Sequence, residues 1–353
     1  MAFLTIHNVS IKGISACVPP KVEENREIPF YTPEEADKVI EMTGIERRHV
    51  VTDGITASDL CLKAGENLIS DLGWEKDTID AIGYVTQMPD YINHPTGFVI
   101  HEKMGLSQEC LVLDIFHGCP GWVVALSAIT SMMSRGDLKR VIMFDGDIST
   151  TWNYANDRES KPLFGDCGTA VALEYDEGAA PLYFHIGTKS TDGWSLVRQY
   201  GGAKNPHTAE SWANELKMRS GELEVSENAD TMDGLSVFSF GITVPPKSIK
   251  KLCEYADVSM EDIDKIVIHQ ANLMIVDKIA KKLKVDKAKT PTSLKDYGNT
   301  TSASIPLTIC SECHNDYSTG KVKSIACAFG VGLSWGSVYF CTDSIVCPDV
   351  IIY

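Results

Sequence analysis

Three polar residues that end predicted strands or lie in turns could together carry out covalent chemistry. Cys119 follows the apolar run 110–116, and His269 ends the apolar run 266–268. Asn299 lies in a turn of glycine and small hydroxyl residues that leads into a helical pattern. A thiol nucleophile, an imidazole and a neutral amide are the groups that acyl transfer with a stabilised oxyanion requires. We therefore interpret the three as candidate catalytic residues, although each one alone could equally be structural.

The residues after Cys119 predict the start of a helix. Pro120 and Gly121 follow the thiol, and apolar residues from Trp122 onward recur at helical spacing. Proline is favoured at the first helical position because its missing N–H would have no partner there. We therefore expect Cys119 at the N-cap, facing unpaired N–H groups and the positive end of the helix dipole. In this position the pKa of the thiol would be lowered and its nucleophilicity raised.

Strand-like and helix-like runs alternate along the chain, which indicates a layered α/β architecture. Several predicted strands are apolar on both faces, as strands between helix layers are. The predicted strands are 1–8, 9–18, 81–86, 111–116, 140–147, 168–174, 182–188, 264–269 and 323–328. The predicted helices are 57–72, 98–104, 120–135, 245–255, 271–283 and 303–313.

A break in this alternation near 175–181 divides the chain into two halves. The N-terminal half, 1–178, carries Cys119, and the C-terminal half, 179–353, carries the other two candidates. Each half contains a strand, a loop with a polar residue and a helix, which hints at internal duplication. The polar segment 200–233 is weakly periodic, and we expect it to be an excursion outside the core.

Composition and charge exclude several classes of protein. No apolar run reaches the ~18 residues that a membrane span needs, and the first residues do not resemble a secretory signal. The 11 cysteines are scattered and mostly lie in apolar segments, which favours reduced thiols and a cytoplasmic protein. The net charge of −16 disfavours nucleic acid as a partner, because phosphate backbones require a basic surface.

Five further stretches combine glycine with polar or small residues at motif-like spacing. The stretches are Thr43-Gly44-Ile45-Glu46-Arg47-Arg48, Phe164-Gly165-Asp166-Cys167-Gly168-Thr169-Ala170, His269-Gln270-Ala271-Asn272, Gly298-Asn299-Thr300 and Ala328-Phe329-Gly330-Val331-Gly332-Leu333-Ser334-Trp335-Gly336-Ser337. With Cys119 they give the order Cys, His, Asn. By these motifs the chain resembles a thiolase-fold condensing enzyme, β-ketoacyl-[acyl carrier protein] synthase III, nearly end to end.

The resemblance implies a thiolase-like α/β fold of five layers, αβαβα, with two similar halves, in a homodimer. It also implies an acyltransferase that condenses an acyl thioester with a malonyl-type thioester by decarboxylation, for fatty acids or related metabolites. Cys119 would carry the acyl group, and His269 and Asn299 would stabilise the enolate. The backbone N–H groups of Cys119 and Val331 would form the oxyanion hole. We expect no metal and no redox cofactor, because the thioester supplies the activation.

The resemblance further implies a substrate pocket and an acyl carrier protein as partner. Phe329, Asn93 and His94 are the candidate pocket residues, and we expect the segment 88–98 to gate the acyl pocket across the dimer. An acidic carrier would need a local basic patch on so acidic a protein. The candidate docking residues are lysines on two predicted helices, although lysines on such helices are often ordinary solvated surface. They are Lys247, Lys250, Lys251, Lys278, Lys281 and Lys282.

Some positions depart from the family pattern. Gly118-Cys119-Pro120-Gly121 replaces the usual Ala-Cys-Ala/Ser-Gly, and Val331 replaces a glycine. Lys38 and Met274 lie where relatives that bind acyl-coenzyme A typically have Trp and Arg. The last two departures weaken the case for an acetyl-coenzyme A primer. They leave open loading from an acyl carrier protein and a role in specialised metabolism.

Two other interpretations stay open. A hydroxymethylglutaryl-coenzyme A synthase-like or other thiolase-fold acyl transferase would need a general-base carboxylate near the cysteine, and Asp90 is the nearest loop candidate. A thiolase-fold partner subunit without activity is the non-catalytic alternative. The presence of all three candidate catalytic residues argues against it.

Overall fold

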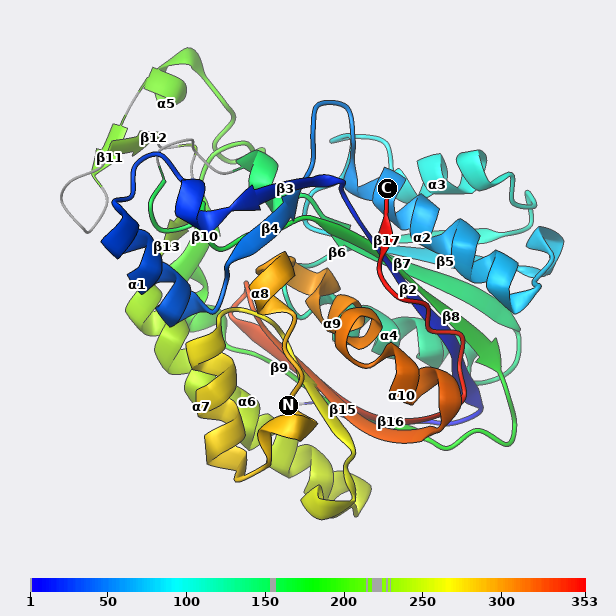
Figure 1. Ribbon diagram of the computed structural model, residues 1–353. Coiled ribbons are helices and arrows are strands. Elements are labelled where there is room, and N and C mark those ends of the chain that lie inside the picture. Colours follow the sequence, from blue (N-terminus) through cyan, green and yellow to red (C-terminus); the bar gives the residue numbers. More distant parts are fainter. Residues whose placement is uncertain (1, 153–156, 214, 218–223, 227, 229) are drawn as a thin grey trace.

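Helices and two sheets form five layers in the computed structural model, which describes residues 2–353 apart from 153–156, 214, 218–223, 227 and 229 (Figure 1). The helices are α1 (Pro33–Thr43), α2 (Ala57–Leu72), α3 (Thr96–Met104), α4 (Gly121–Met133), α5 (Ala209–Ala213), α6 (Gly234–Ala256), α7 (Leu273–Leu283), α8 (Leu294–Tyr297), α9 (Ser304–Glu312) and α10 (His314–Thr319). Helices α4 and α9 lie between the sheets, α2 and α3 cover one outer face, and α6 and α7 cover the other. The layered α/β fold expected from the sequence is thus confirmed.

The two large sheets differ in their strand content. The six-stranded sheet has the order β17 (Ile351–Ile352), β2 (Val9–Val18), β8 (Cys167–Tyr175), β7 (Arg140–Asp147), β5 (Ala81–Thr86) and β6 (Leu111–Phe116). The five-stranded sheet has the order β1 (Ala2–Ile6), β9 (Leu182–Thr188), β16 (Ser334–Asp343), β15 (Lys321–Gly330) and β14 (Lys265–Ile268). Smaller two-stranded ribbons pair β3 (Lys21–Glu24) with β4 (Arg47–Val50), β10 (Leu196–Arg198) with β13 (Asp230–Met232), and β11 (Glu215–Lys217) with β12 (Glu224–Ser226). The described part of the expected excursion, 200–233, contains α5, β11, β12 and β13, and β13 pairs with β10, which lies just before the excursion.

The two sheets repeat one topology. Strands β2, β8, β7 and β5 follow the same order and directions as β9, β16, β15 and β14, with two antiparallel pairs and then one parallel pair. The chain passes from the first sheet to the second between β8 and β9. The terminal strands cross back, because β1 pairs with β9 and β17 pairs with β2. Each end of the chain therefore adds a strand to the sheet formed by the other half.

The two middle-layer helices, α4 and α9, contribute to one core cluster with both sheets. The apolar residues that recur at helical spacing on α4 are buried against both sheets; they are Trp122, Leu126, Ile129 and Met133. Ile305 and its neighbours on α9 join the same core cluster. Burial of an apolar helix face against the core stabilises the helix. The apolar face of α4 is buried between the two sheets, which places the N-terminal end of the helix inside the protein.

Helix α6 differs from its prediction. It begins at Gly234 rather than at Pro245, so Pro245 and Pro246 lie inside the helix. A proline in a helix leaves the carbonyl four residues earlier without its donor. The freed carbonyl of Ile242 accepts a hydrogen bond from Nζ of Lys282 on α7, at 2.8 Å. The sequence signal was misleading because this replacement donor comes from a neighbouring helix.

None of the helices in the described part of the chain has the length and apolar character needed to cross a bilayer.

A buried arginine holds the segment of the N-terminal half that contacts Asn299. Arg48 on β4 is 1% exposed, and its Nε donates to Oδ1 of Asn25 at 2.9 Å. One terminal nitrogen donates to the carbonyl of Phe164 at 3.2 Å. Gly165, which follows Phe164, donates its N–H to the Asn299 carbonyl at 3.1 Å, so this segment contacts the backbone of Asn299. The guanidinium therefore satisfies polar groups that would otherwise be buried without partners.

We expect R48M to lower the free energy of unfolding by about 3–5 kcal/mol, because it leaves several buried polar groups without their donor. The matched control is R47M on the same strand. Arg47 pairs with Glu24 and Asp296 at the surface, so its loss should cost about 0–1 kcal/mol. Urea unfolding followed by circular dichroism measures both values. Equal losses in the two variants would show that the buried network is unimportant.

Candidate active site

The three candidate catalytic residues come from elements that meet at the end of β15. Cys119 lies between β6 and the start of α4, and His269 directly follows β14, the neighbour of β15. Asn299 precedes the helical turn that leads into α9. The N-terminal ends of both middle-layer helices therefore lie at one site. The contacts described below connect the three residues through the loop after β15 and the turn before α9.

Cys119 packs against the glycine loop, Gly330–Gly332, which starts at the last residue of β15. Its side chain is 7% exposed, and a Cβ atom on Gly330 would lie 2.7 Å from its sulfur. Only a residue without a side chain permits this approach. On the other side, a Cβ on Gly118 would lie 2.9 Å from Cβ of Val331. Glycine at both positions thus lets the loop close over the thiol. The N-cap prediction is wrong by one residue, since Pro120 takes the N-cap position of α4 and Cys119 precedes it.

The prediction of a lowered thiol pKa is also wrong. Burial raises the pKa of the Cys119 thiol to about 11, and the buried carboxylates Asp147 and Asp145 add to the rise. Hydrogen bonding by the backbone of Val331 and of Cys119 itself lowers the pKa only in part. Loss of hydration disfavours the thiolate more than nearby N–H dipoles favour it. The sulfur is therefore protonated near neutral pH, with the two predicted oxyanion-hole residues directed at it.

His269 is a buried, neutral imidazole. Burial lowers its pKa to about 4, with a partly opposing hydrogen bond to the backbone of Thr301. Its Nδ1 lies 2.7 Å from Oγ of Ser304, and that hydroxyl also accepts the N–H of Gln270 at 3.4 Å. We therefore assign the hydroxyl proton to the bond with Nδ1, which leaves the ring proton on Nε2. In that tautomer the ring can donate a hydrogen bond without carrying a charge.

Asn299 is held at its backbone and at one end of its side chain. Its N–H donates to the carbonyl of Leu163 at 2.8 Å, and its Oδ1 accepts the N–H of Thr301 at 2.9 Å. An amide whose oxygen is occupied in this way presents its NH₂ group in the opposite direction. Gly298 before it has φ of +65°, and a Cβ there would lie 2.7 Å from the Leu163 carbonyl. The turn thus requires glycine and fixes the carboxamide as a donor.

The predicted pocket residues fall into two groups. Phe329 is 3% exposed and makes an edge-to-face contact with His269, with ring centroids 5.5 Å apart. Asn93 and His94 lie on the surface of the single chain, where the His94 ring contacts Phe98 and Tyr91. No contact among the described residues joins them to Cys119. Phe329 is therefore part of the candidate site, whereas the loop that carries Asn93 and His94 is not part of it within one chain.

The predicted docking lysines do not form one patch. Lys278 and Lys281 line a groove of about 370 Å³ between α1 and α7, together with Met42 and Met274. Lys282 is engaged with the freed carbonyl on α6. The other three lysines, Lys247, Lys250 and Lys251, lie on α6. The C-terminal part of this helix approaches β1 and β9. There burial lowers the pKa of His185, and the charge of Lys251 lowers it further.

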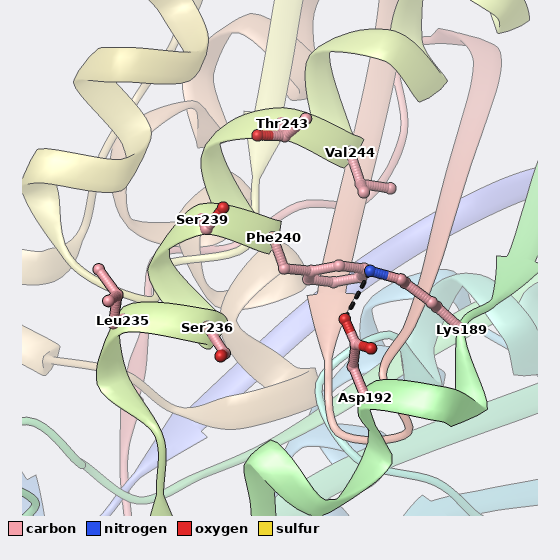
Figure 2. A pocket seen from close by; sticks show the side chains of 8 residues that line it. All are labelled: Lys189, Asp192, Leu235, Ser236, Ser239, Phe240, Thr243 and Val244. Carbon is pink, nitrogen blue, oxygen red and sulfur yellow. Dashed lines mark ion pairs between the residues drawn. The ribbon is translucent and has the colours of Figure 1, made fainter.

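A second pocket lies outside the glycine loop rather than around the thiol. Figure 2 shows this pocket of about 340 Å³ between the turn Ser190–Ser195 and the first turns of α6. Lys189 and Asp192 form an ion pair of 2.5 Å across it, and Ser236 is one of the helix residues that face it (Figure 2). The Lys189 N–H donates to the carbonyl of Leu333 at 2.7 Å, so the pocket borders the outer side of that loop. None of the candidate catalytic residues lines it.

Sequence reasoning misses two residues near the site. Asp147 is buried at the end of β7, and Thr301 lies between Asn299 and α9. A carboxylate that ends an apolar strand is the same kind of signal that singles out His269, so the sequence does contain a signal for Asp147. Thr301 carries no signal of its own, because its backbone conformation is not visible in its residue type.

Comparisons with known proteins identify the family of the chain. A family model described as 3-oxoacyl-[acyl-carrier-protein (ACP)] synthase III matches residues 113–190, and a model of the C-terminal part of the same enzyme matches residues 253–341. The β-ketoacyl-[acyl-carrier-protein] synthase III of Clostridium perfringens (strain ATCC 13124) is 30% identical over 94% of this chain and 98% of its own. The enzyme of the same name from Lactococcus lactis (strain IL1403) is 31% identical over 93% of this chain and 97% of its own.

Solved structures give the same result. The crystal structure of a 3-oxoacyl-(acyl-carrier protein) synthase from Burkholderia xenovorans LB400 has a TM-score of 0.92 and 32% identity, covering 100% of this chain and 99% of that one. A match of this extent in sequence and in fold does not favour the hydroxymethylglutaryl-coenzyme A synthase or partner-subunit interpretations. The chain belongs to the β-ketoacyl-[acyl-carrier-protein] synthase III family of condensing acyltransferases.

Proposed function

We propose that Cys119 carries an acyl group and that this acyl group is condensed with a malonyl-type thioester, with loss of CO₂. The observation that carries the proposal is the enclosed thiol at the end of β15, with the backbone of Val331 on one side. His269 and the Asn299 carboxamide lie at the same end of the sheet. The bonds that break and form are carbon–sulfur, sulfur–hydrogen and carbon–carbon bonds, and the thioester linkage activates each acyl group.

In the first half-reaction the Cys119 sulfur loses its proton and attacks the carbonyl carbon of an acyl thioester. The bond between that carbon and the sulfur of the donor breaks, and the donor leaves as a thiol that takes up one proton. The backbone N–H groups of Cys119 and Val331 stabilise the negative oxygen that forms during attack. Low dielectric around a buried site strengthens these hydrogen bonds.

In the second half-reaction the carbon–carbon bond to the malonyl carboxylate breaks and CO₂ leaves. The electron pair forms an enolate, whose oxygen accepts hydrogen bonds from Nε2 of His269 and from the NH₂ group of Asn299. The enolate carbon then attacks the acyl carbon on Cys119. The carbon–sulfur bond breaks, and the released sulfur takes up a proton to restore the resting thiol.

An acyl carrier protein is the proposed bearer of the malonyl group, in keeping with the names of the relatives. Its docking site in this proposal is the groove between α1 and α7. Lys278 and Lys281 supply the positive charge there, beside Glu41 and Asp277. The exposed side chains of Met42 and Met274 supply an apolar floor.

We also propose that the protein acts in the cytoplasm. All eleven cysteines are free thiols, which supports a reducing environment.

The active form in this proposal is a homodimer formed through β6. This strand is the last of its sheet, so one edge presents unpaired N–H and C=O groups. Phe116 at its end is 77% exposed, and Ile92 in the neighbouring loop is 99% exposed. Burial of such an apolar edge against a second copy would be favourable. It would also bring the loop of Asn93 and His94 next to the partner chain.

We expect F116E to convert the dimer into monomers, because a carboxylate cannot be buried at that edge without a partner. Sedimentation velocity over a range of protein concentrations measures the change. The matched control is L235E, which places the same charge at another exposed apolar residue, on α6. A parent protein that sediments as a monomer would contradict the dimer, as would F116E and L235E behaving alike.

We expect C119A to take up no acyl group when it is incubated with acyl donors, whereas H269A should be acylated but condense at least about 100-fold more slowly. Intact-protein mass spectrometry measures acylation, and release of labelled CO₂ measures decarboxylation. The control is C341A, which removes a half-buried thiol on β16 and should keep both activities. Acylation of C119A at the parent level would refute the assigned nucleophile.

We expect the alkylation of Cys119 by iodoacetamide to rise about tenfold per pH unit between pH 7 and 9. Only the thiolate reacts, and its fraction grows tenfold per unit below a pKa of about 11. Peptide mass spectrometry after short exposures measures the rate at this one residue. A rate that levels off below pH 9 would mean that the thiol is already ionised and that its pKa is lowered after all.

A further inference from the structure

Asp147 is a buried carboxylate whose two oxygens both accept hydrogen bonds. Its Oδ1 accepts the hydroxyl of Thr86 at 2.7 Å and the N–H of Gln87 at 3.0 Å. Its Oδ2 accepts the hydroxyl of Thr301, and the Ser302 hydroxyl, which donates to Oδ1 of Asp145, lies 3.4 Å from the same oxygen. Asp147 lies in the N-terminal half, whereas Thr301 and Ser302 lie in the C-terminal half. The carboxylate therefore connects the two halves beside the candidate active site.

Thr301 occupies a conformation that its residue type disfavours. Its φ is +52°, in the left-handed region that β-branched residues rarely adopt. Such a conformation persists only where the surroundings hold it, and such residues cluster at functional sites. The bond from its hydroxyl to Asp147 is a restraint of this kind, because the accepting carboxylate is itself fixed from the other side by Thr86 and Gln87.

The backbone of Thr301 contacts both candidate enolate donors. Its N–H donates to Oδ1 of Asn299 at 2.9 Å, which decides which end of the carboxamide faces the reacting oxygen. The Thr301 carbonyl also faces the His269 ring, because it opposes the fall in the imidazole pKa that burial causes. If Thr301 moved out of its left-handed conformation, both of these contacts would change together.

We propose that Asp147 and Thr301 form a positioning pair that orients the Asn299 carboxamide and the His269 ring for condensation. The pair acts through the hydroxyl of Thr301 and touches no substrate. The proposal rests on the function proposed above, because it takes Asn299 and His269 as the donors to the enolate. Acylation of Cys119 uses backbone N–H groups instead, so the pair serves the second half-reaction and not the first.

The test is the variant T301V, which removes the hydroxyl and keeps the size and branching of the side chain. Condensation should fall about 10- to 100-fold in kcat, as is usual when an orienting partner is lost. The rate of acylation, followed by intact-protein mass spectrometry in a single turnover, should remain at the parent value. T301S keeps the hydroxyl and should recover most of the condensation rate. A merely structural role would not separate the two half-reactions in this way.

The matched control is T300V, one residue earlier in the same buried turn. Among the described residues the Thr300 hydroxyl has no hydrogen-bond partner, so its removal breaks no bond. T300V should therefore acylate and condense as the parent does. If T301V does not fold by circular dichroism, T301A is measured in the same way and the same outcomes apply.

Condensation by T301V at the parent rate would overturn the proposal, and so would an equal loss of acylation and condensation. Failure of T301S to recover activity would also overturn it, because the hydroxyl would then not be the working group. These results differ from a failure of the proposed function. In that case the unaltered protein itself would not acylate Cys119 or would not condense.

Discussion

Exclusion of water around the thiol is the constraint on which the rest of the site depends. The same loss of hydration raises the pKa of Cys119 and lowers the pKa of His269, so both groups are neutral at rest. A neutral imidazole carries an N–H group, so it can donate a hydrogen bond to an enolate without first being protonated. The low dielectric also makes each N–H donor more effective where negative charge develops. The cost of this arrangement is that the proposed nucleophile must lose its proton as part of the reaction.

The duplicated architecture explains why the polar groups meet where they do. Both middle-layer helices, α4 and α9, begin at the site, and the strands β7 and β15 that end there hold equivalent positions in the two sheets. Their last residues have diverged. Asp147 supplies a carboxylate that links the halves, whereas Gly330 supplies the space that the sulfur of Cys119 requires. One repeated geometry thus serves two chemical purposes.

Much of the fold could be predicted from the sequence. The strands β2, β5, β6, β7 and β9 and the helix α2 have the predicted bounds, because their hydrophobic patterns are long and end at clear turn signals. The starts of α4 and α6 could not be predicted from their prolines. Pro120 marks the N-cap itself, and Pro245 and Pro246 lie inside a helix, where the carbonyl freed by Pro246 finds a donor on α7. A proline predicts a helix boundary only if the carbonyl that it frees has no other donor. Here Lys282, a residue distant in sequence, supplies that donor.

The sequence by itself determined which chemical groups are available and on which elements they lie. Residue type and periodicity are local properties, so they suffice to place Cys119, His269 and Asn299 at the ends of strands and helices. Tertiary structure alone decided the protonation of the thiol and of the imidazole, the direction of the amide, and the exposure of the loop at Asn93 and His94. These properties depend on burial and on hydrogen bonds between residues far apart in the chain, such as Asp147 and Thr301. No local pattern records them, because desolvation is set by whatever packs around a group and not by its neighbours in sequence.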